Sequence, residues 1–410
     1  MSEQQQTTSD EREGEEPFTQ RFVRELTTGS VMVTFLSVVL ALIIGAILIA
    51  VSDPEVQDSV GYFTDRPSDT FSAIGDAVGG AYSALFTGSI IDFSEYTVGR
   101  ALLPLGETLT NATPLIAAGL GFALAFRAGL FNIGGEGQII LGAIFAGYVG
   151  FGMDLPVGIH LVLGVAAGML GGALWGGIVG FLKARTGAHE VIVTIMLNYI
   201  ARFLIAYLLT TSVFQRAGAS NPVSPQVHDS AVLPTFFDSS RLHLGFILVF
   251  AAAAGVWWLL SRSTVGFEFR AVGANPHAAR TAGMSVARAY ILVMVLAGAL
   301  AGLAGVAQVL GTERYLTSGI SSGIGFDAIT VALLGRANPW GTVAAGLLFG
   351  ALRAGAVTMQ ASTGTSVDII LVIQSLIVLF IAAPPLVRTV FRVRVRDTGG
   401  VGARSMGWGS

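Results

Sequence analysis

Polar residues inside an apolar sequence are the candidates for chemistry, and their densest group lies in the segment FNIGGEGQ, residues 131–138. Its candidate residues are Asn132, Gly134, Gly135, Glu136 and Gln138. Amide and carboxylate groups at membrane depth need a partner or a water-filled cavity. Glycine-rich backbone between two short apolar runs is typical of an unwound or re-entrant crossing, which is tolerated only against protein or water. The segment therefore either lines a path for a solute or forms a turn that caps the next helix.

Two further polar groups occur in apolar surroundings. Glu190, Asn198 and Arg202 are spaced by eight and four residues, so they lie near one face of a predicted helix. Asn198 either hydrogen-bonds a solute hydroxyl or, with its two neighbours, connects helices. Asp327 and Asn338 flank a short apolar run that loosely repeats the arrangement around FNIGGEGQ. Discontinuous helices at matching places in two halves point to a central binding site.

A charged segment between two long apolar runs, residues 266–288, predicts a short surface helix. Asn275 and Pro276 form a helix-start signature, since the amide caps the first turn and proline has a suitable φ. Gly283 provides the stop, so the predicted helix covers Pro276–Ala282, about two turns. Ser285 then caps the following helix. A helix this short cannot cross a membrane, and we interpret it as a surface that another protein binds. The residues that we assign to this surface are Arg270, Gly273, Asn275, Pro276, Ala279, Arg280 and Gly283.

Several kinds of site are disfavoured by the composition. The sequence has no cysteine, and its five histidines show no pair at helical spacing, so a metal site is not expected. The only lysine, Lys183, lies in FLKAR and not in a phosphate-binding loop. The chain is therefore not itself a nucleotide-driven motor of that type. The arginines of the C-terminal tail follow an apolar helix directly, so we interpret them as orienting that helix and do not expect nucleic-acid binding.

The composition predicts an all-α polytopic membrane protein, because 53% of the 410 residues are hydrophobic and only 12% are charged. We expect about ten transmembrane segments with broken or re-entrant helices and one short cytoplasmic helix. The apolar runs lie near residues 31–51, 101–126, 139–152, 157–182, 190–211, 243–260, 286–310, 325–335, 340–359 and 367–387. Nine or eleven segments remain open, because residues 101–152 are ambiguous. Residues 107–111 interrupt the first run of this region, which suggests a broken helix there.

The distribution of basic residues predicts the orientation. With both termini in the cytoplasm, 16 of the 23 Lys and Arg residues lie inside, five lie outside and two lie within helices. The opposite orientation would place the basic side outside. The first apolar run is too long for a signal peptide and follows a long acidic leader, which favours a retained helix over a cleaved one.

Glycines at intervals of four residues predict close helix contacts. They include Gly164, Gly168, Gly172, Gly176 and Gly180 on one helix, Gly298 and Gly302 on another, and Gly346 and Gly350 on a third. Small residues at this spacing let helix backbones approach closely in a membrane. The pattern is compatible with tight packing within the chain, which we favour, or with a dimer face.

Taken together, four motifs in order resemble the permease subunits of ATP-binding-cassette (ABC) importers of the branched-chain amino acid, ribose and nucleoside class. RAVGANPHAARTAGM (270–284) is similar to the family's cytoplasmic coupling loop. FNIGGEGQ, EVIVTIMLNYIA (190–201) and GFDAITVALLGRANPWG (325–341) are similar to the branch that imports nucleosides with a basic-membrane-protein-type lipoprotein. The resemblance covers roughly residues 100–385. His189 replaces the usual asparagine of that branch, and the acidic segment 52–100 has no counterpart in it.

The resemblance implies a transport subunit that is not an enzyme and binds no cofactor, with ATP and Mg²⁺ used by a separate cytoplasmic ATPase. The other implied partners are a second permease subunit, identical or related, an extracellular solute-binding lipoprotein, the lipid bilayer and a nucleoside or simple sugar as the substrate. We expect a disordered cytoplasmic tail at residues 1–30, a permease domain at 31–390 and a cytoplasmic tail at 391–410. Within the domain, 52–100 would be an extracellular loop and 262–288 the cytoplasmic coupling loop. The protein would reside in the cell membrane.

Two other classes of function remain. An ion- or proton-coupled secondary transporter would draw its energy from its own membrane carboxylates, for which Glu136, Glu190 and Asp327 are the candidates. A membrane-embedded enzyme would need a nucleophile with a base or a set of metal ligands, and the sequence contains no such cluster.

Overall fold

The computed structural model describes residues 30–237 and 240–391 and divides into two compact units. The smaller unit joins the N-terminal residues up to Leu48 with the chain after Ile370, and the larger unit comprises Ile49–Ile370. The described elements are α-helical, apart from a π-helical turn and two isolated β-bridges. Except for Ser30 and Phe391, the predicted cytoplasmic tails lie outside the described residues.

The smaller unit contains most of helix α2 (Ser30–Ser52), most of α16 (Asp368–Ala382) and α17 (Pro384–Phe391). The axes of α16 and α17 differ by 93° where Ala383 and the following prolines interrupt the helix. Proline cannot continue the hydrogen-bond ladder of the preceding turn, which accounts for the bend.

The larger unit begins with three helices from the acidic segment that was expected to be a loop. They are α3 (Pro54–Val60), α4 (Pro67–Thr87) and α5 (Val98–Ala101). Helix α3 is capped by Asp53, whose carboxylate accepts hydrogen bonds from the backbone N–H groups of Glu55 and Val56. Helix α4 packs against α15. The segment is therefore mostly helical.

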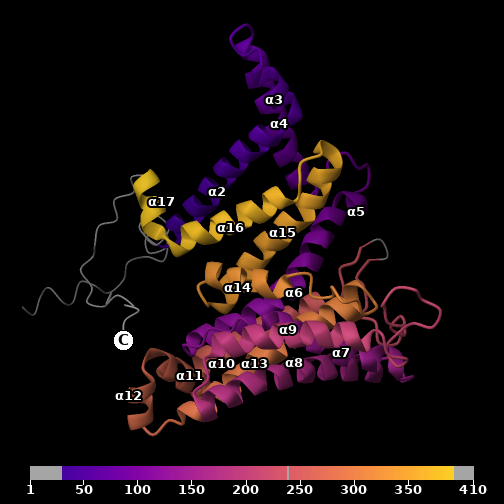
Figure 1. Cartoon of the computed structure of the whole chain (residues 1–410), viewed down its shortest axis with the longest axis vertical. Coiled ribbons are helices and arrows are strands. Elements are labelled where there is room, and N and C mark those ends of the chain that lie inside the picture. Colours follow the sequence, from indigo (N-terminus) through magenta and orange to yellow (C-terminus); the bar gives the residue numbers. More distant parts are fainter. Residues whose placement is uncertain (1–29, 238–239, 392–410) are drawn as a thin grey trace, which may run out of the picture. The chain divides into compact units, whose positions relative to one another are not determined.

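The remaining helices of the larger unit form a bundle around α6 and α13 (Figure 1). They are α6 (Leu103–Arg127), α7 (Gly135–Gly152), α8 (Ile159–Thr186), α9 (Glu190–Leu208), α10 (Gly245–Arg262), α11 (Thr264–Ala274), α12 (Pro276–Thr281), α13 (Val286–Val306), the π-helical turn η2 (Ala307–Thr312), α14 (Ile324–Leu334) and α15 (Pro339–Thr363). Helix α13 packs against α6, α7 and α8, and α6 also contacts α14 and α15.

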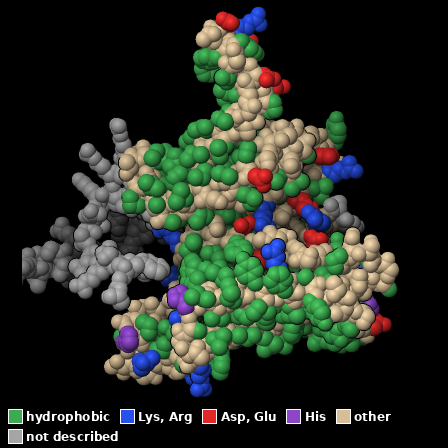
Figure 2. All heavy atoms as spheres, in the orientation of Figure 1, with side chains coloured by type: hydrophobic (Ala, Val, Ile, Leu, Met, Phe, Trp, Pro, Cys, Tyr) green, Lys and Arg blue, Asp and Glu red, His purple; other side chains and the backbone are tan. Residues whose placement is uncertain are grey.

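Seven helical stretches in the described residues are long and apolar enough to cross a membrane, or eight if the bent pair α16 and α17 forms one span. The difference from the expected ten comes from α7 and α14, and also from α16 where the bent pair is not counted as a span. Helix α14 has only 11 residues, and α7 begins with the polar sequence GEGQ. Figure 2 shows hydrophobic side chains over large areas of the visible surface, as expected for a protein surrounded by lipid.

Helix α6 corrects the prediction of a break at residues 107–111, because it continues without interruption from Leu103 to Arg127. The polar side chains that suggested a break bond within the helix or to neighbours. Thr110 donates to the carbonyl of Gly106, and the Asn111 amide donates to the carbonyl of Glu107. Glu107 itself pairs with Arg241 at 2.6 Å. A polar run therefore need not break a helix whose side chains find these acceptors.

The glycine spacing is explained by packing within the chain. A Cβ atom on Gly172 would overlap the carbonyl oxygen of Gly298, and one on Gly302 would overlap the carbonyl oxygen of Gly168. Gly350 of α15 packs in the same way against Ala112 of α6. The glycine-lined faces of α8, α13 and α15 are thus occupied by helices of the same chain, which confirms the tight-packing interpretation.

Candidate functional site

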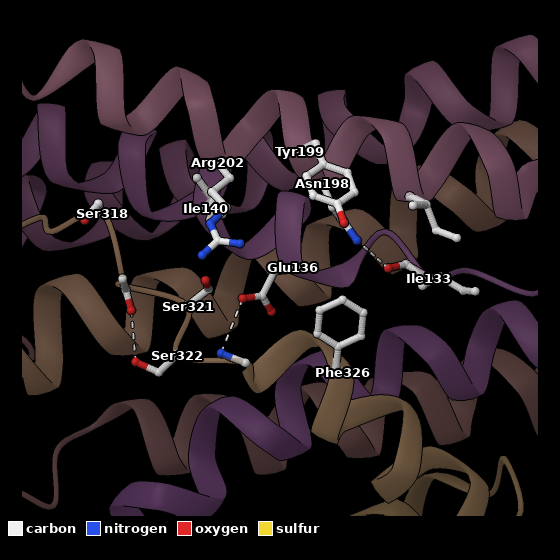
Figure 3. Close-up of a pocket in the computed structure, with 13 residues that line it drawn as sticks. Ile133, Glu136, Ile140, Asn198, Tyr199, Arg202, Ser318, Ser321, Ser322 and Phe326 are labelled. Carbon is white, nitrogen blue, oxygen red and sulfur yellow. Dashed lines mark hydrogen bonds between the residues drawn. The ribbon is translucent and has the colours of Figure 1, made fainter.

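A cavity of about 540 Å³ lies between α9, the first turn of α7 and the segment leading into α14 (Figure 3). Ligand pockets in proteins usually have volumes of about 300–1,000 Å³, so this cavity is large enough for a small solute. Its polar lining comes from Glu136, Asn198, Arg202 and the serines Ser318, Ser321 and Ser322, and its aromatic lining from Tyr199 and Phe326.

Glu136 connects the first turn of α7 with the start of α14. Its Oε1 accepts a hydrogen bond from the backbone N–H of Gly323 at 3.3 Å, and its Oε2 accepts one from Gly325 at 2.9 Å. The first N–H groups of a helix have no partner within it, and a carboxylate there also interacts favourably with the helix dipole. A Cβ atom on Gly325 would overlap the backbone of Glu136, so glycine permits the close approach.

Asn198 holds α9 against the FNIGGEGQ segment. Its Oδ1 accepts from the backbone N–H of Gly137 at 2.8 Å, and its Nδ2 donates to the carbonyl of Ile133 at 2.8 Å. The side chain is 8% exposed. Both ends of the amide are therefore engaged with backbone groups, which is the arrangement expected of a residue that connects elements.

Arg202 follows Asn198 by one helical turn and also lines the cavity. Among the described residues, no hydrogen-bond acceptor or carboxylate pairs with its guanidinium group, and the side chain is exposed. Figure 3 shows the guanidinium group extending from α9 toward Glu136 and Ser321 on the opposite side. Arg202 is thus a charged group that lies within a predicted membrane span and points into the cavity.

The other residues predicted for a solute path lie outside this lining. Asn132 and Gln138 are each 1% exposed and hydrogen-bond to one another at 3.2 Å, and Gly134 and Gly135 belong to the same turn. This pair fixes the FNIGGEGQ segment from within. Of the predicted residues in this segment, only Glu136 reaches the cavity.

Three more predicted residues have structural partners. Glu190 pairs with Lys183 at 2.7 Å, joining the ends of α8 and α9. Asp327 of α14 pairs with Arg353 of α15. Asn338 caps α15, because its Oδ1 accepts from the N–H groups of Trp340 and Gly341. None of the three contributes to the cavity wall that the described residues form.

Sequence reasoning did not select the aromatic and serine lining. Tyr199 and Phe326 are 54% and 53% exposed and lie at opposite sides of the cavity (Figure 3). Ser318, Ser321 and Ser322 are in the irregular segment before α14. The sequence SGISSGIG, with its glycines and hydroxyl groups, is a signal for a non-helical segment that could have indicated it.

The predicted surface helix is present as α12, one residue shorter than expected. The Oδ1 atom of Asn275 accepts from the N–H groups of His277 and Ala278, and Gly283 has φ +83°. Ala279 is buried against neighbouring residues, whereas Arg280 is exposed. Figure 1 shows α12 at the far end of α11, beyond the ends of the long helices.

The α11–α12 segment contacts the bundle at the end of α6 and at the start of α13. A Cβ atom on Gly273 would overlap the carbonyl oxygen of Arg127, the last residue of α6, which leaves room only for glycine. Arg288 at the start of α13 pairs with Glu268 of α11 at 3.3 Å. Ser285 caps α13 by accepting from the N–H of Arg288. Of the residues assigned to this surface, Arg270 lies on α11, half-buried.

A second polar cavity, of about 430 Å³, lies at the N-terminal end of α6, away from Arg127. Its walls include Asp92, Glu107, Arg241 and Arg353. Arg241 donates two hydrogen bonds to the Glu107 carboxylate, which raises the pKa of Arg241 above its ordinary value. The Ser94 hydroxyl and backbone N–H donate to Asp92 and lower the pKa of that carboxyl. Each of these charges therefore has a partner, because Arg241 pairs with Glu107, Asp92 accepts from Ser94, and Arg353 pairs with Asp327 of α14.

Comparison with known proteins places these features in a family. A family described as "Branched-chain amino acid transport system / permease component" matches residues 105–382. The guanosine ABC transporter permease protein NupP of Bacillus subtilis is 42% identical over 322 residues, which cover 77% of this chain and 89% of that protein.

Two further relatives have different named solutes. A nucleoside ABC transporter permease protein of Lactococcus lactis is 38% identical, with 68% of this chain and 79% of that protein covered. A glucose ABC transporter permease protein of Haloferax volcanii is 35% identical, with 68% and 75% covered. No solved structure matches the chain. The matched region includes the cavity and the capped surface helix, and the chain belongs to the family of permease components of the branched-chain amino acid transport system.

Proposed function

We propose that this chain forms the translocation path of an ABC importer and carries a nucleoside or a simple sugar across the cell membrane. The observation that carries the proposal is a polar cavity, built around Glu136 and Arg202, inside an otherwise apolar bundle of helices. Relatives named as permeases for guanosine, nucleosides and glucose support this class of solute. A neutral solute rich in hydroxyl groups fits a cavity with one cation, one carboxylate and three serines.

Helix α12 is the coupling element in this proposal. Its exposed Arg280 and its position at one end of the bundle suit it to contact a cytoplasmic ATPase, which uses ATP and Mg²⁺. The cap at Asn275 and the contact of Gly273 with Arg127 make the α11–α12 segment stiff. A displacement of α12 then moves α13 through Gly283 and Ser285, and the cavity opens alternately to either side.

The topology that we propose has ten segments, in which α7 and α14 are short crossings buried against protein. Both termini face the cytoplasm. The end of the larger unit near α12 also holds the C-terminal ends of α6 and α8, with Arg127, Lys183 and Arg185. Arg216, Arg241 and Arg314 lie near the opposite end. Arg270 on α11, Arg280 on α12 and Arg288 at the start of α13 add to the α12 end, and this excess of basic residues supports its assignment to the cytoplasm.

The working importer would contain two permease chains and an extracellular solute-binding lipoprotein. This chain is similar to two differently named guanosine ABC transporter permease proteins of Bacillus subtilis, at 42% and 29% identity. Two such chains in one organism support a pair of related permeases rather than two identical ones.

An ion-coupled mechanism is less well supported. The three carboxylates that it would use are already engaged: Glu136 with backbone N–H groups, Glu190 with Lys183 and Asp327 with Arg353. A carboxylate that carries a proton or cation through a cycle needs to exchange its partners readily, whereas each of these stabilises a contact between helices.

The test is to express the chain with its ATPase, partner permease and binding protein and to replace Arg280 by Glu or Pro276 by Gly. Both changes should abolish co-purification with the ATPase and ATP-dependent uptake, by charge reversal at the contact and by loss of the fixed helix start. Arg66→Glu is the control, since Arg66 is exposed and lies before α4. Unchanged assembly and uptake in both variants would exclude the coupling role.

A further inference from the structure

Arg202 has a property that the general transport function does not explain. It lies in the second half of the apolar helix α9, within a predicted membrane span, and lacks a partner among the described residues. A charged side chain at membrane depth is costly and is normally paired or in contact with water. By contrast, Arg353, which lies in the interior of α15, pairs with Asp327. Among the described residues nothing fills this role, so we take water or the solute that enters the cavity as the partner of Arg202.

The chemistry around Arg202 restricts what can enter. A guanidinium group has only hydrogen-bond donors, arranged in a planar fork that suits two acceptors side by side. The Glu136 carboxylate opposite it balances the charge of the cavity, so an anionic solute has no electrostatic advantage. Each Glu136 oxygen accepts one hydrogen bond from the described residues and retains a lone pair for a solute hydroxyl. The solute should be neutral, with two adjacent acceptors at one end and hydroxyl groups at the other.

The aromatic residues of the cavity add a flat surface. Tyr199 and Phe326 are about half exposed and project from α9 and α14 on either side of the space (Figure 3). Nucleobases stack on aromatic side chains, and every base has a suitable π-face. A sugar ring alone would offer neither a planar surface nor a pair of acceptors without donors.

We propose that Arg202 determines specificity and recognises the 6-oxopurine base of a nucleoside through its O6 and N7 atoms. This inference rests on the proposed function and names the substrate class of the same cavity. Guanine presents O6 and N7 as adjacent acceptors, which arginine binds with both arms of its fork. Adenine presents an N6 amino donor beside N7, and this donor faces the donors of Arg202 without a bond. The ribose hydroxyls then lie toward Glu136 and the serines.

The experiment measures uptake of radiolabelled guanosine, adenosine and glucose by the complete importer in the wild type and in Arg202→Gln. Glutamine is the side chain that pairs with both N6 and N7 of adenine. Guanosine uptake should fall by about 10-fold or more and adenosine uptake should fall less or rise, so the guanosine-to-adenosine ratio should decrease. Arg202→Lys keeps the charge without the fork and should also lower guanosine uptake. The binding protein is the same throughout, so a change of ratio reports on the permease.

Arg185→Gln is the matched control, because Arg185 lies at the end of α8 over the Phe181 ring and away from the cavity. It should leave the ratio unchanged. Co-purification of each variant with the ATPase identifies chains that assemble.

If assembled Arg202→Gln keeps the wild-type ratio, or loses both nucleosides equally, the specificity role is wrong while the transport function stands. Wild-type uptake of glucose but of neither nucleoside would also overturn the inference and leave an importer for sugars. Wild-type uptake of none of the three solutes would overturn both proposals.

Discussion

Asn198 is the residue on which the shape of the candidate site most depends, because one side chain connects α9 to both sides of the FNIGGEGQ turn. Replacing it by Ala leaves the Gly137 N–H and the Ile133 carbonyl without their partner. Each unsatisfied buried group costs about 1–3 kcal/mol, so we expect a clearly lower thermal unfolding midpoint for the purified protein in detergent. Asn221→Ala, at an exposed loop position, is the control. Equal midpoints for the two variants would show that the bridge contributes no stability.

His243 makes the stability of the loop before α10 depend on pH. The ring is 1% exposed, its Nδ1 accepts from the Gly245 N–H at 3.1 Å, and burial, aided by the charge of Arg314, lowers its pKa to about 4. In the unfolded chain its pKa would be about 6.5. Between these values the unfolded chain binds a proton that the folded chain does not. The contribution of His243 to the free energy of unfolding is therefore fully present above pH of about 6.5 and is lost as the pH falls toward about 4.

The loss from His243 amounts to at most about 3 kcal/mol across that range. Unfolding midpoints of the wild type should therefore drop between pH 7.5 and 4.5, and the drop should be smaller in His243→Gln. His277→Gln changes an exposed histidine of α12 and should behave like the wild type. A wild-type slope that survives in His243→Gln would assign the pH dependence to other groups.

At the scale of elements, local signals were reliable where a few adjacent residues determine the structure. Asn275, Pro276 and Gly283 define α12 because the cap, the fixed φ and the left-handed stop all act within the segment itself. The same reasoning failed for α6, where the polar run beginning at Glu107 suggested a break. Its hydrogen bonds, and the pairing with Arg241 from a distant loop, are not visible in hydropathy.

Close contact between α8 and α13 is the element-scale feature that mutation tests most directly. In Gly172→Ala the added methyl group would overlap the Gly298 carbonyl oxygen, so the two helices must separate. Overpacking of this kind costs about 1–3 kcal/mol, and we expect a lower unfolding midpoint and less protein in the membrane. Gly255→Ala on α10 is the matched control, because a Cβ atom there meets nothing within 4 Å. A midpoint unchanged in Gly172→Ala would contradict the close backbone contact.

For the molecule as a whole, the family and the helical class followed from motifs and composition, but the cavity did not. Its walls come from α7, α9 and the segment before α14. Glu136 accepts a hydrogen bond from the N–H of Gly325, which lies 189 positions later in the sequence. Spacing along one helix brought Asn198 and Arg202 together correctly. It could not identify Phe326 or the serines, because their place depends on how distant helices pack.

The orientation in the membrane decides whether α12 can meet a cytoplasmic ATPase, and the absence of cysteine makes it measurable. Single-cysteine variants Ser220→Cys and Thr281→Cys place a thiol at exposed positions near opposite ends of the bundle, in the loop after α9 and at the end of α12. A membrane-impermeant maleimide should label Ser220→Cys in intact cells and Thr281→Cys only after permeabilisation. The wild type gives the background, and labelling after denaturation verifies that both thiols react. The reverse pattern would place α12 outside the cell, where no ATPase could move it, and the cavity would then need another source of energy.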